Sequence, residues 1–292
     1  MFSDRAHVQV HPCWTLDRHV FDATLREHAI KNGVVFVSCS RIRSERKNAE
    51  ILFDLETFDP PNPRKVSTPI LIEATGRGPG FTSEARRAYH DRLVALAIDV
   101  TSPSVGDGLL RVIPTREGWW YWVDRPSPSQ TLVYLTDGDL LPPSPDGLLA
   151  WLEAEGSRDN NLPKGEMTLR LHSSKGEAAR PTIVDARTGI RREWGPFNRL
   201  PIGDAAFTLD PLSGSGLSRA LEMANQASTS ADEYLATGDP ETCARLMLAF
   251  IDEYRQNLIK GRLSYNQAAT RFPESTFWQR RRENGNGDIA KS

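Results

Sequence analysis

The sequence predicts an α/β fold in which an antiparallel sheet is inserted between two parts of a helix-and-strand domain, with further helices at the C-terminus. Three patterns indicate this fold. A capped helix followed by a β-branched run lies near the N-terminus, short strand-like runs separated by turn residues fill the middle, and helical periodicity dominates after residue 199.

The N-terminal part is expected to combine one helix with short strands. Asp17 is placed to cap a helix in which Phe21, Leu25 and Ala29 recur every four residues and which ends at Gly33. The prolines of segment 60–63 predict an exposed loop. Short alternating or apolar runs predict strands at residues 5–10, 34–37, 51–55 and 69–72.

The middle of the chain predicts the antiparallel sheet. Strand-like runs separated by Gly, Pro, Ser and Asp lie at residues 93–100, 109–113, 119–123 and 131–135. A helix is expected at residues 144–155, and two more strands at 168–171 and 182–185.

The C-terminal part is predicted to be helical. One helix is expected at residues 213–227, and a second begins at Asp239-Pro240, where aspartate suits the cap and proline the first turn. Gly261 is the expected end of this second helix, because glycine is common just past a helix end. Residues 271–280 are typical of a basic helix end, which the helix dipole favours.

The composition fits an ordinary globular protein and excludes several other classes. The chain has 292 residues, 39% hydrophobic and 25% charged, so a disordered or collagen-like protein is excluded. Its 36 basic and 38 acidic side chains give a net charge of -2, which provides no electrostatic reason to expect nucleic acid or an acidic membrane as a partner. No apolar run reaches the ~20 residues that a membrane helix needs.

The N-terminus lacks the charged-then-apolar layout of a signal peptide, so we expect a cytoplasmic protein. Cys13, Cys39 and Cys243 are scattered and are expected to be ordinary reduced thiols. There is no His-Glu-x-x-His, Gly-x-Ser-x-Gly or phosphate-loop pattern, and no metal site is expected.

The segment LPIGDAAFTLDPLSGSGL, residues 200–217, has the residues of a ligand site. A short strand ends in Gly-Asp, and a proline turn leads through glycines into a helix. Such a helix start offers free backbone N–H groups and a positive dipole end to an electron-rich ligand. Gly214 and Gly216 allow the backbone to approach a flat ring, and Asp204 can accept hydrogen bonds from a polyol. A plain strand–turn–helix connection remains open as the alternative.

The stretch GDAAFTLDPLSGSGLSRALEMA resembles the second FAD motif of flavin-dependent monooxygenases and halogenases. In that family the aspartate of the Gly-Asp pair binds the ribityl chain, and the Asp-Pro…Gly loop lies along the isoalloxazine ring. The resemblance implies cofactor-binding roles for Gly203, Asp204, Pro211, Gly214, Ser215 and Gly216. It also implies a discontinuous FAD-binding domain with an inserted antiparallel β-sheet substrate domain and C-terminal helices.

Two shorter segments are similar to the same family and follow its order. LDRHVFD resembles a helix start whose arginine, here Arg18, lies near the FAD phosphates; a capped surface helix with a solvated arginine is the alternative. EATGR, residues 73–77, resembles a strand end near the adenosine half of FAD and implicates Thr75, Gly76 and Arg77. Glu73 replaces the more usual aspartate, and a strand that ends in a glycine turn is the alternative.

The aromatic run GWWYW, residues 118–122, lies on a predicted strand. Trp120 and Trp122 therefore share one face of the sheet, and Trp119 and Tyr121 share the other. Trp120 and Trp122 are candidates for lining an aromatic substrate pocket, and core packing is an equally weighted alternative. The Trp-x-Trp-x-Ile-Pro pattern of the family's halogenases is incomplete here, so the region more closely resembles the monooxygenases.

The resemblance covers residues 5–282 but begins after the family's first FAD motif, Gly-x-Gly-x-x-Gly. We therefore expect an N-terminally incomplete FAD-binding domain, with weak or absent FAD binding by this chain alone. The expected divisions are residues 1–85 and 190–230 for the two FAD-domain parts, 86–189 for the substrate sheet, 231–283 for the C-terminal helices and 284–292 for a flexible tail.

The function that the resemblance implies is an FAD-dependent monooxygenase. Reduced FAD would form a C4a-hydroperoxide with O2 and oxygenate an electron-rich aromatic substrate, either a small molecule or a peptidyl group. NAD(P)H or a flavin-reducing partner would supply the electrons, and no catalytic side chain is expected because the cofactor carries the chemistry. A non-catalytic remnant or partner-binding protein of the same fold is the alternative, and a flavin-dependent halogenase is the third choice.

Overall fold

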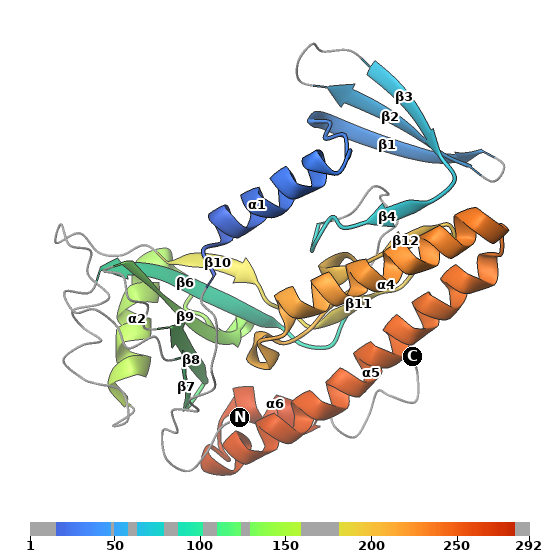
Figure 1. Cartoon of the computed structure of the whole chain (residues 1–292). Coiled ribbons are helices and arrows are strands. Elements are labelled where there is room, and N and C mark those ends of the chain that lie inside the picture. The colour runs from blue at the N-terminus through green and yellow to red at the C-terminus, as the bar shows by residue number, and fades with distance from the viewer. Residues whose placement is uncertain are drawn as a thin grey trace.

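A computed structural model describes residues 16–47, 50–57, 63–78, 87–101, 110–123, 129–158 and 181–283. Five antiparallel strands form the sheet on the left of Figure 1. Their order is β10 (Thr182–Asp185), β6 (Leu93–Thr101), β9 (Ser129–Asp137), β8 (Gly118–Val123) and β7 (Leu110–Thr115). The predicted antiparallel sheet, with a strand at each of these runs, is confirmed.

Helices cover both faces of this sheet. Side chains of a strand alternate between its faces, so Trp120 shares a core with Leu152 of α2 (Pro145–Arg158). On the other face, Trp119 shares a core with residues of α5 (Pro240–Arg271) and α6 (Thr276–Glu283), including Trp278. Trp119 and Trp120 of β8 are fully buried, with 0% of their surface exposed.

A second group of short strands surrounds the start of α4 (Gly216–Thr237). β4 (Leu71–Glu73) and β12 (Arg199–Pro201) pair in parallel, while β11 (Gly189–Arg191) pairs antiparallel with both β5 (Arg87–Tyr89) and β13 (Phe207–Thr208). The described ranges also contain three 3-10 turns: η1 (Gly138–Leu140), η2 (Gly203–Ala205) and η3 (Pro211–Ser213). A core that includes Leu200, Phe207, Met223 and Phe250 joins these strands to α4 and α5.

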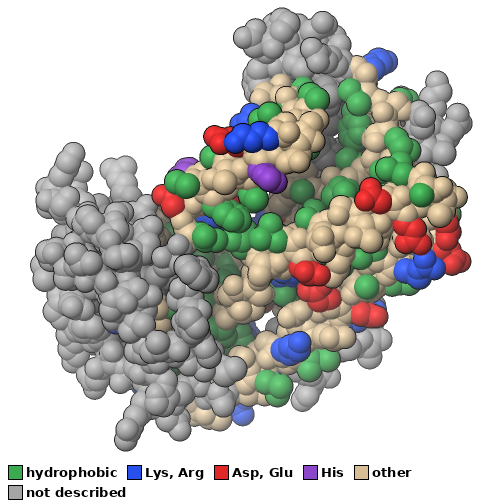
Figure 2. Space-filling view, in the orientation of Figure 1, with side chains coloured by type: hydrophobic (Ala, Val, Ile, Leu, Met, Phe, Trp, Pro, Cys, Tyr) green, Lys and Arg blue, Asp and Glu red, His purple; other side chains and the backbone are tan. Residues whose placement is uncertain are grey.

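The N-terminal helix and the first three strands stand apart from these cores (Figure 1). Asp17 caps α1 (Arg18–Lys31) by accepting hydrogen bonds from the backbone N–H groups of His19 and Val20, as predicted. β1 (Cys39–Lys47), β2 (Glu50–Thr57) and β3 (Pro63–Thr68) form an antiparallel ribbon. No residue of α1 is buried, and Figure 2 shows hydrophobic side chains along α1 and between α1 and α4.

Several element predictions are wrong. Residues 34–37 form no strand; they are exposed and pair with no strand in the described part of the chain. α5 does not end at Gly261 but continues to Arg271, because its last turns pack Tyr265, Ala268 and Ala269 against the sheet. β1 and β3 were not predicted. The predicted strands at 5–10 and 168–171 and the tail 284–292 lie outside the described residues.

Within the described ranges, no helix has the length and apolar character needed to cross a lipid bilayer.

Candidate functional site

The two motif segments that flank the predicted ligand site meet in space. β4 and β12 pair in parallel with Glu73 opposite Pro201, and the backbone N–H of Ile202 donates to the Glu73 carbonyl at 2.9 Å. Parallel strands end at the same edge of a sheet, so the Thr75-Gly76-Arg77 turn and the Gly203-Asp204 turn leave that edge side by side. Such edges are where α/β folds bind ligands.

Asp204 lies between two arginines at this edge. Its carboxylate accepts a hydrogen bond from Arg219 Nη2 at 3.0 Å and lies 3.3 Å from Arg77 Nε. The Asp204 side chain keeps 36% of its surface exposed, whereas that of Arg219 keeps 5%. A carboxylate has about four lone-pair directions, so Asp204 retains capacity to accept hydrogen bonds from a ligand.

Arg87 of β5 links the two turns by hydrogen bonds to their backbone carbonyl groups. Its Nη2 donates to the Gly76 carbonyl at 3.2 Å, to the Ala205 carbonyl at 3.3 Å and to the Asp204 carbonyl. Burial lowers the pKa of Arg87, but the side chain remains a guanidinium cation. The site therefore contains three cations around one carboxylate.

Three buried donor atoms of these arginines have no hydrogen-bond partner among the described residues: Arg87 Nη1, Arg219 Nε and Arg219 Nη1. Buried donors are normally satisfied, since an unsatisfied one costs about 1–3 kcal/mol. The excess positive charge and the unsatisfied donors suit a ligand that carries negative charge and acceptor oxygens.

The loop from Asp210 to Gly216 leads from the Gly-Asp turn to α4. Asp210 caps η3 by accepting from the Leu212 N–H at 2.9 Å, and Gly214 adopts a left-handed conformation with φ of 60°. Among the described residues, a Cβ atom added at Gly214 or Gly216 would meet nothing within 4 Å, so the described part of the chain leaves space beside this backbone. The N-cap residue of α4, Ser215, makes no side-chain cap hydrogen bond to a described residue, so no described cap offsets the positive dipole end of the helix.

The remaining predicted cofactor residues lie in different settings. Asp204 and its three arginines, Arg77, Arg87 and Arg219, are called the Asp204 cluster below. The Thr75 hydroxyl donates to Glu73 Oε1 at 3.2 Å, next to this cluster. Pro211 is the first residue of η3, and the Ser215 hydroxyl lies 2.9 Å from that of Ser213. Arg18 is exposed at the start of α1 and pairs with Asp22 at 3.1 Å; no described contact joins it to the other predicted residues.

The prediction that Trp120 lines a substrate pocket is not supported. Trp120 is fully buried, and its ring centroid lies 4.7 Å from that of Tyr134, inside the core between the sheet and α2. This corresponds to the core alternative, because a ring enclosed by α2 offers no surface to a ligand. Trp122 belongs to β8, but its side chain lies outside the described part.

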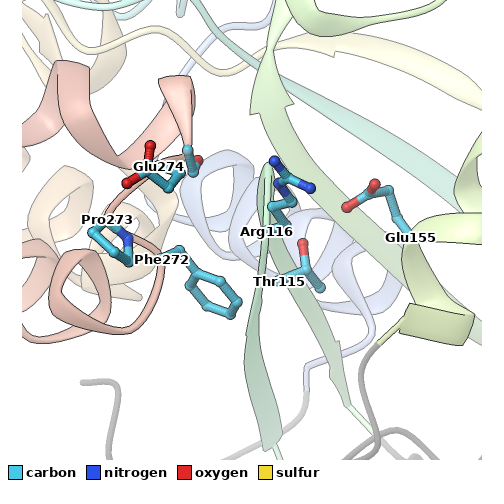
Figure 3. A pocket seen from close by; sticks show the side chains of 7 residues that line it. Thr115, Arg116, Glu155, Phe272, Pro273 and Glu274 are labelled. Carbon is cyan, nitrogen blue, oxygen red and sulfur yellow. The ribbon is translucent and has the colours of Figure 1, made fainter.

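A cavity of about 430 Å³ lies at the end of the five-stranded sheet, where the α5–α6 connection crosses it (Figure 3). In Figure 3, Arg116 extends between Glu155 and Glu274. The lining residues are Thr115, Arg116, Glu155, Phe272, Pro273, Glu274 and Ser275. None of the predicted cofactor residues lines this cavity, so it is separate from the Asp204 cluster.

Sequence reasoning missed Arg87 and Arg219. Arg219 had a detectable signal, since it lies four residues before Met223 and eight before Ala227, on the same face of the helix as these apolar side chains. Arg87 had none, because its role depends on the two turns that tertiary structure brings to it.

No family model matches the chain. LodB of Marinomonas mediterranea, named as an FAD-dependent oxidoreductase, is 22% identical over 276 residues, which cover 92% of this chain and 71% of LodB. The solved structure of QhpG, a peptidyl tryptophan dihydroxylase, matches with a TM-score of 0.70 and 22% identity over 91% of this chain. The flavin-dependent halogenase CmlS matches with a TM-score of 0.69 and 19% identity over 94% of this chain.

A tryptophan halogenase from Shewanella frigidimarina also matches, with a TM-score of 0.65 and 19% identity over 92% of this chain. The chain spans 59% of the QhpG structure, 52% of CmlS and 49% of the Shewanella enzyme. These similarities confirm the predicted mixed α/β fold with an antiparallel sheet and C-terminal helices.

Proposed function

We propose, on the premise that the chain has the fold of flavin-dependent halogenases and oxidoreductases, that it acts as an FAD-dependent oxidoreductase of the monooxygenase type. One observation carries the proposal. Two motif turns that are far apart in the sequence leave the β4–β12 edge together and bring Asp204 between Arg77 and Arg219, beside an open glycine loop that leads into α4.

The residues present fit FAD. Asp204 keeps part of its carboxylate exposed and would accept hydrogen bonds from ribityl hydroxyls. The open backbone at Gly214 and Gly216 would lie along the isoalloxazine ring, with the α4 dipole favouring negative charge on the ring. The unsatisfied donors of Arg219 would meet acceptor atoms of the cofactor, whose negative charge offsets the excess of cations.

The chain's own task in this proposal is to bind and orient. When bound, FAD supplies the redox and oxygen chemistry. Asp204 and the glycine loop would fix the ring, and the five-stranded sheet with its helices would enclose the substrate and exclude water. The names of two structural neighbours, a peptidyl tryptophan dihydroxylase and a tryptophan halogenase, support an electron-rich aromatic substrate. NAD(P)H or a flavin-reducing partner would deliver the electrons.

Asp204→Asn tests the site. The amide removes the negative charge that orders two arginines, and it replaces one acceptor by a donor, so FAD binding should weaken about tenfold or more. The measurement is a titration of the chain with FAD, followed by quenching of flavin fluorescence. Asp139→Asn is the matched control, since Asp139 also lies between two arginines, Arg92 and Arg280, and is similarly exposed at 38%.

Comparison of FAD binding by the two variants tests whether Asp204 binds the cofactor. Weaker binding in Asp204→Asn with unchanged binding in Asp139→Asn supports the assigned site. Equal binding in both would reject Asp204 as a cofactor ligand. No binding by the parent chain up to high micromolar FAD would agree with the weak or absent binding expected of this chain alone, and it would reject the proposed FAD-dependent activity for this chain.

Halogenation is the second candidate, because flavin-dependent halogenases are among the structural neighbours. Incubation with reduced FAD, O2 and an indole substrate, with and without bromide, separates the two. A product that gains oxygen without a need for halide supports the monooxygenase, and a brominated product supports the halogenase.

A further inference from the structure

A chain of hydrogen bonds joins the Asp210–Gly216 loop to the five-stranded sheet through α5. Trp119 Nε1 donates to the Tyr265 hydroxyl at 3.2 Å, and the Tyr265 hydroxyl donates to Asp210 Oδ2 at 2.6 Å. The other carboxylate oxygen of Asp210 accepts from the Leu212 N–H at 2.9 Å. Hydrogen bonds thus link β8 to α5 through Trp119 and Tyr265, and α5 to the loop before η3 through Tyr265 and Asp210.

Tyr265 holds a fixed position in this chain. It is 5% exposed, and its ring centroid lies 5.7 Å from that of Trp278 and 6.4 Å from that of Phe277. The Arg281 guanidinium lies 5.3 Å from the centre of the Tyr265 ring. A ring packed on several sides cannot change rotamer easily, so its hydroxyl remains directed at Asp210.

The protonation states suit the direction of the hydrogen bonds. Burial, together with the charge of Asp210, raises the pKa of Tyr265 well above its ordinary value. The hydroxyl therefore stays protonated and donates a hydrogen bond to Asp210. Burial also raises the pKa of Asp210, and the hydrogen bonds from Tyr265 and Leu212 oppose that increase by stabilising the carboxylate.

The Asp210 carboxylate controls the path of the loop. It caps η3, which ends at the left-handed Gly214 and leads directly to the start of α4. If Oδ2 lost its donor, the side chain would be free to rotate, and the cap bond to Leu212 would loosen with it.

We propose that Tyr265, itself held by Trp119, is a positioning residue that fixes Asp210 and so sets the Asp210–Gly216 loop relative to the sheet. The role of this loop toward a flavin ring rests on the proposed function. The position of the loop relative to the sheet does not depend on the proposed function, and amide hydrogen exchange measures it separately.

Tyr265→Phe removes one hydroxyl and keeps the packed ring. The matched control is Tyr254→Phe on the same helix, because Tyr254 is 3% exposed and its hydroxyl has no hydrogen-bond partner among the described residues. Amide hydrogen exchange of peptides that cover residues 210–216 reports the loop. Exchange of the Leu212, Ser213 and Gly214 amides should become about tenfold faster in Tyr265→Phe and stay unchanged in Tyr254→Phe.

Asp210→Asn provides a second variant, since it keeps an acceptor for Leu212 but weakens the bond from Tyr265. It should raise exchange in the same peptides, with exchange in the middle of α5 unchanged. If exchange at residues 210–216 is unchanged in Tyr265→Phe, or rises equally in Tyr254→Phe, the positioning role is overturned.

Titration of the same proteins with FAD separates this inference from the proposed function. Tyr265→Phe should bind FAD several-fold more weakly than Tyr254→Phe and shift the visible absorption of the bound flavin. Faster loop exchange with FAD binding and spectrum unchanged would overturn the link to the flavin. Faster exchange with no FAD binding by the parent chain would reject the proposed function and leave the positioning role standing.

Discussion

Glu73 lies fully buried between two arginines at the end of β4. Its carboxylate accepts from Arg191 Nη1 at 2.7 Å and from Arg199 Nε at 2.9 Å. Burial alone would raise the pKa of Glu73, but the hydrogen bonds and charges of Arg191 and Arg199 outweigh burial, and the net effect is a lowered pKa. The cluster ties β4 to β11 and β12 directly behind the predicted cofactor turns.

Glu73→Gln should therefore destabilise the protein strongly. Removing one charge from a buried cluster leaves uncompensated buried cations, which typically costs about 3–5 kcal/mol. Urea denaturation followed by circular dichroism measures the change in the free energy of unfolding. Asp252→Asn is the control, since Asp252 and Arg255 form an exposed pair at 3.3 Å whose loss should cost about 0.5 kcal/mol or less.

The pH dependence of this effect has a defined sign. The folded-state pKa of Glu73 lies below its ordinary value of 4.5, so the stabilisation is complete above about pH 4.5 and is lost as the pH falls through the lowered folded-state pKa. The difference between the parent and Glu73→Gln should stay constant from neutral pH to about pH 5 and shrink below that. A difference independent of pH would show that shape, not charge, is responsible.

At the scale of the elements, Gly261 offers a test of α5. It lies inside the helix, and an added Cβ would meet no described atom within 4 Å. Glycine is less favourable than alanine in a helix interior, so Gly261→Ala should raise the free energy of unfolding by about 0.5–1 kcal/mol, measured by thermal denaturation. Gly118→Ala in β8 should do the opposite, since its Cβ would lie 2.2 Å from the Leu135 carbonyl oxygen. Destabilisation by Gly261→Ala would contradict the uninterrupted helix.

The sequence predicted elements well where local signals determine them. The caps Asp17 and Asp239 begin their helices as expected, because a cap bonds only to its own first turn. Tertiary structure determines the elements that the sequence did not predict correctly. The ribbon strand β1 carries mostly polar and charged side chains, so it shows no hydrophobic alternation, and α5 passes Gly261 because residues beyond it are packed in a core.

The residues of the candidate site also divide into those that a local motif identifies and those that only tertiary structure brings into place. Gly203, Asp204 and Gly214 belong to a continuous motif whose order could be recognised, and their strand–turn–helix geometry follows from short-range preferences. Arg87 could not be found, because it acts on Gly76 and Asp204, which approach it only when β4 and β12 pair. The assigned cofactor roles stay predictions until the Asp204 variants are measured.

At the scale of the whole molecule, α5 connects two hydrophobic cores. Its first half places Met247 and Phe250 in the core around β12, β13 and α4. Its second half places Tyr265 and Ala269 in the core under the five-stranded sheet, together with Phe277 of α6. Neither core can lose its helix without disturbing the other, because a helix propagates cooperatively through its length.

The two cores should therefore unfold in one transition. Phe250→Ala and Phe277→Ala each remove a ring that is at most 1% exposed, and each should cost about 3–5 kcal/mol. Helical circular dichroism reports mainly α4 and α5. Tryptophan fluorescence, recorded in a Trp194→Phe background because Trp194 packs against the core of Phe250, reports mainly the cores on the two faces of the sheet, where Trp119, Trp120, Trp151 and Trp278 lie. Both variants should lower the midpoints of both signals together, because each damages a core that α5 shares. If Phe250→Ala shifted only the circular dichroism transition and left the fluorescence transition in place, the two cores would be independent folding units, and α5 would not transmit stability between them.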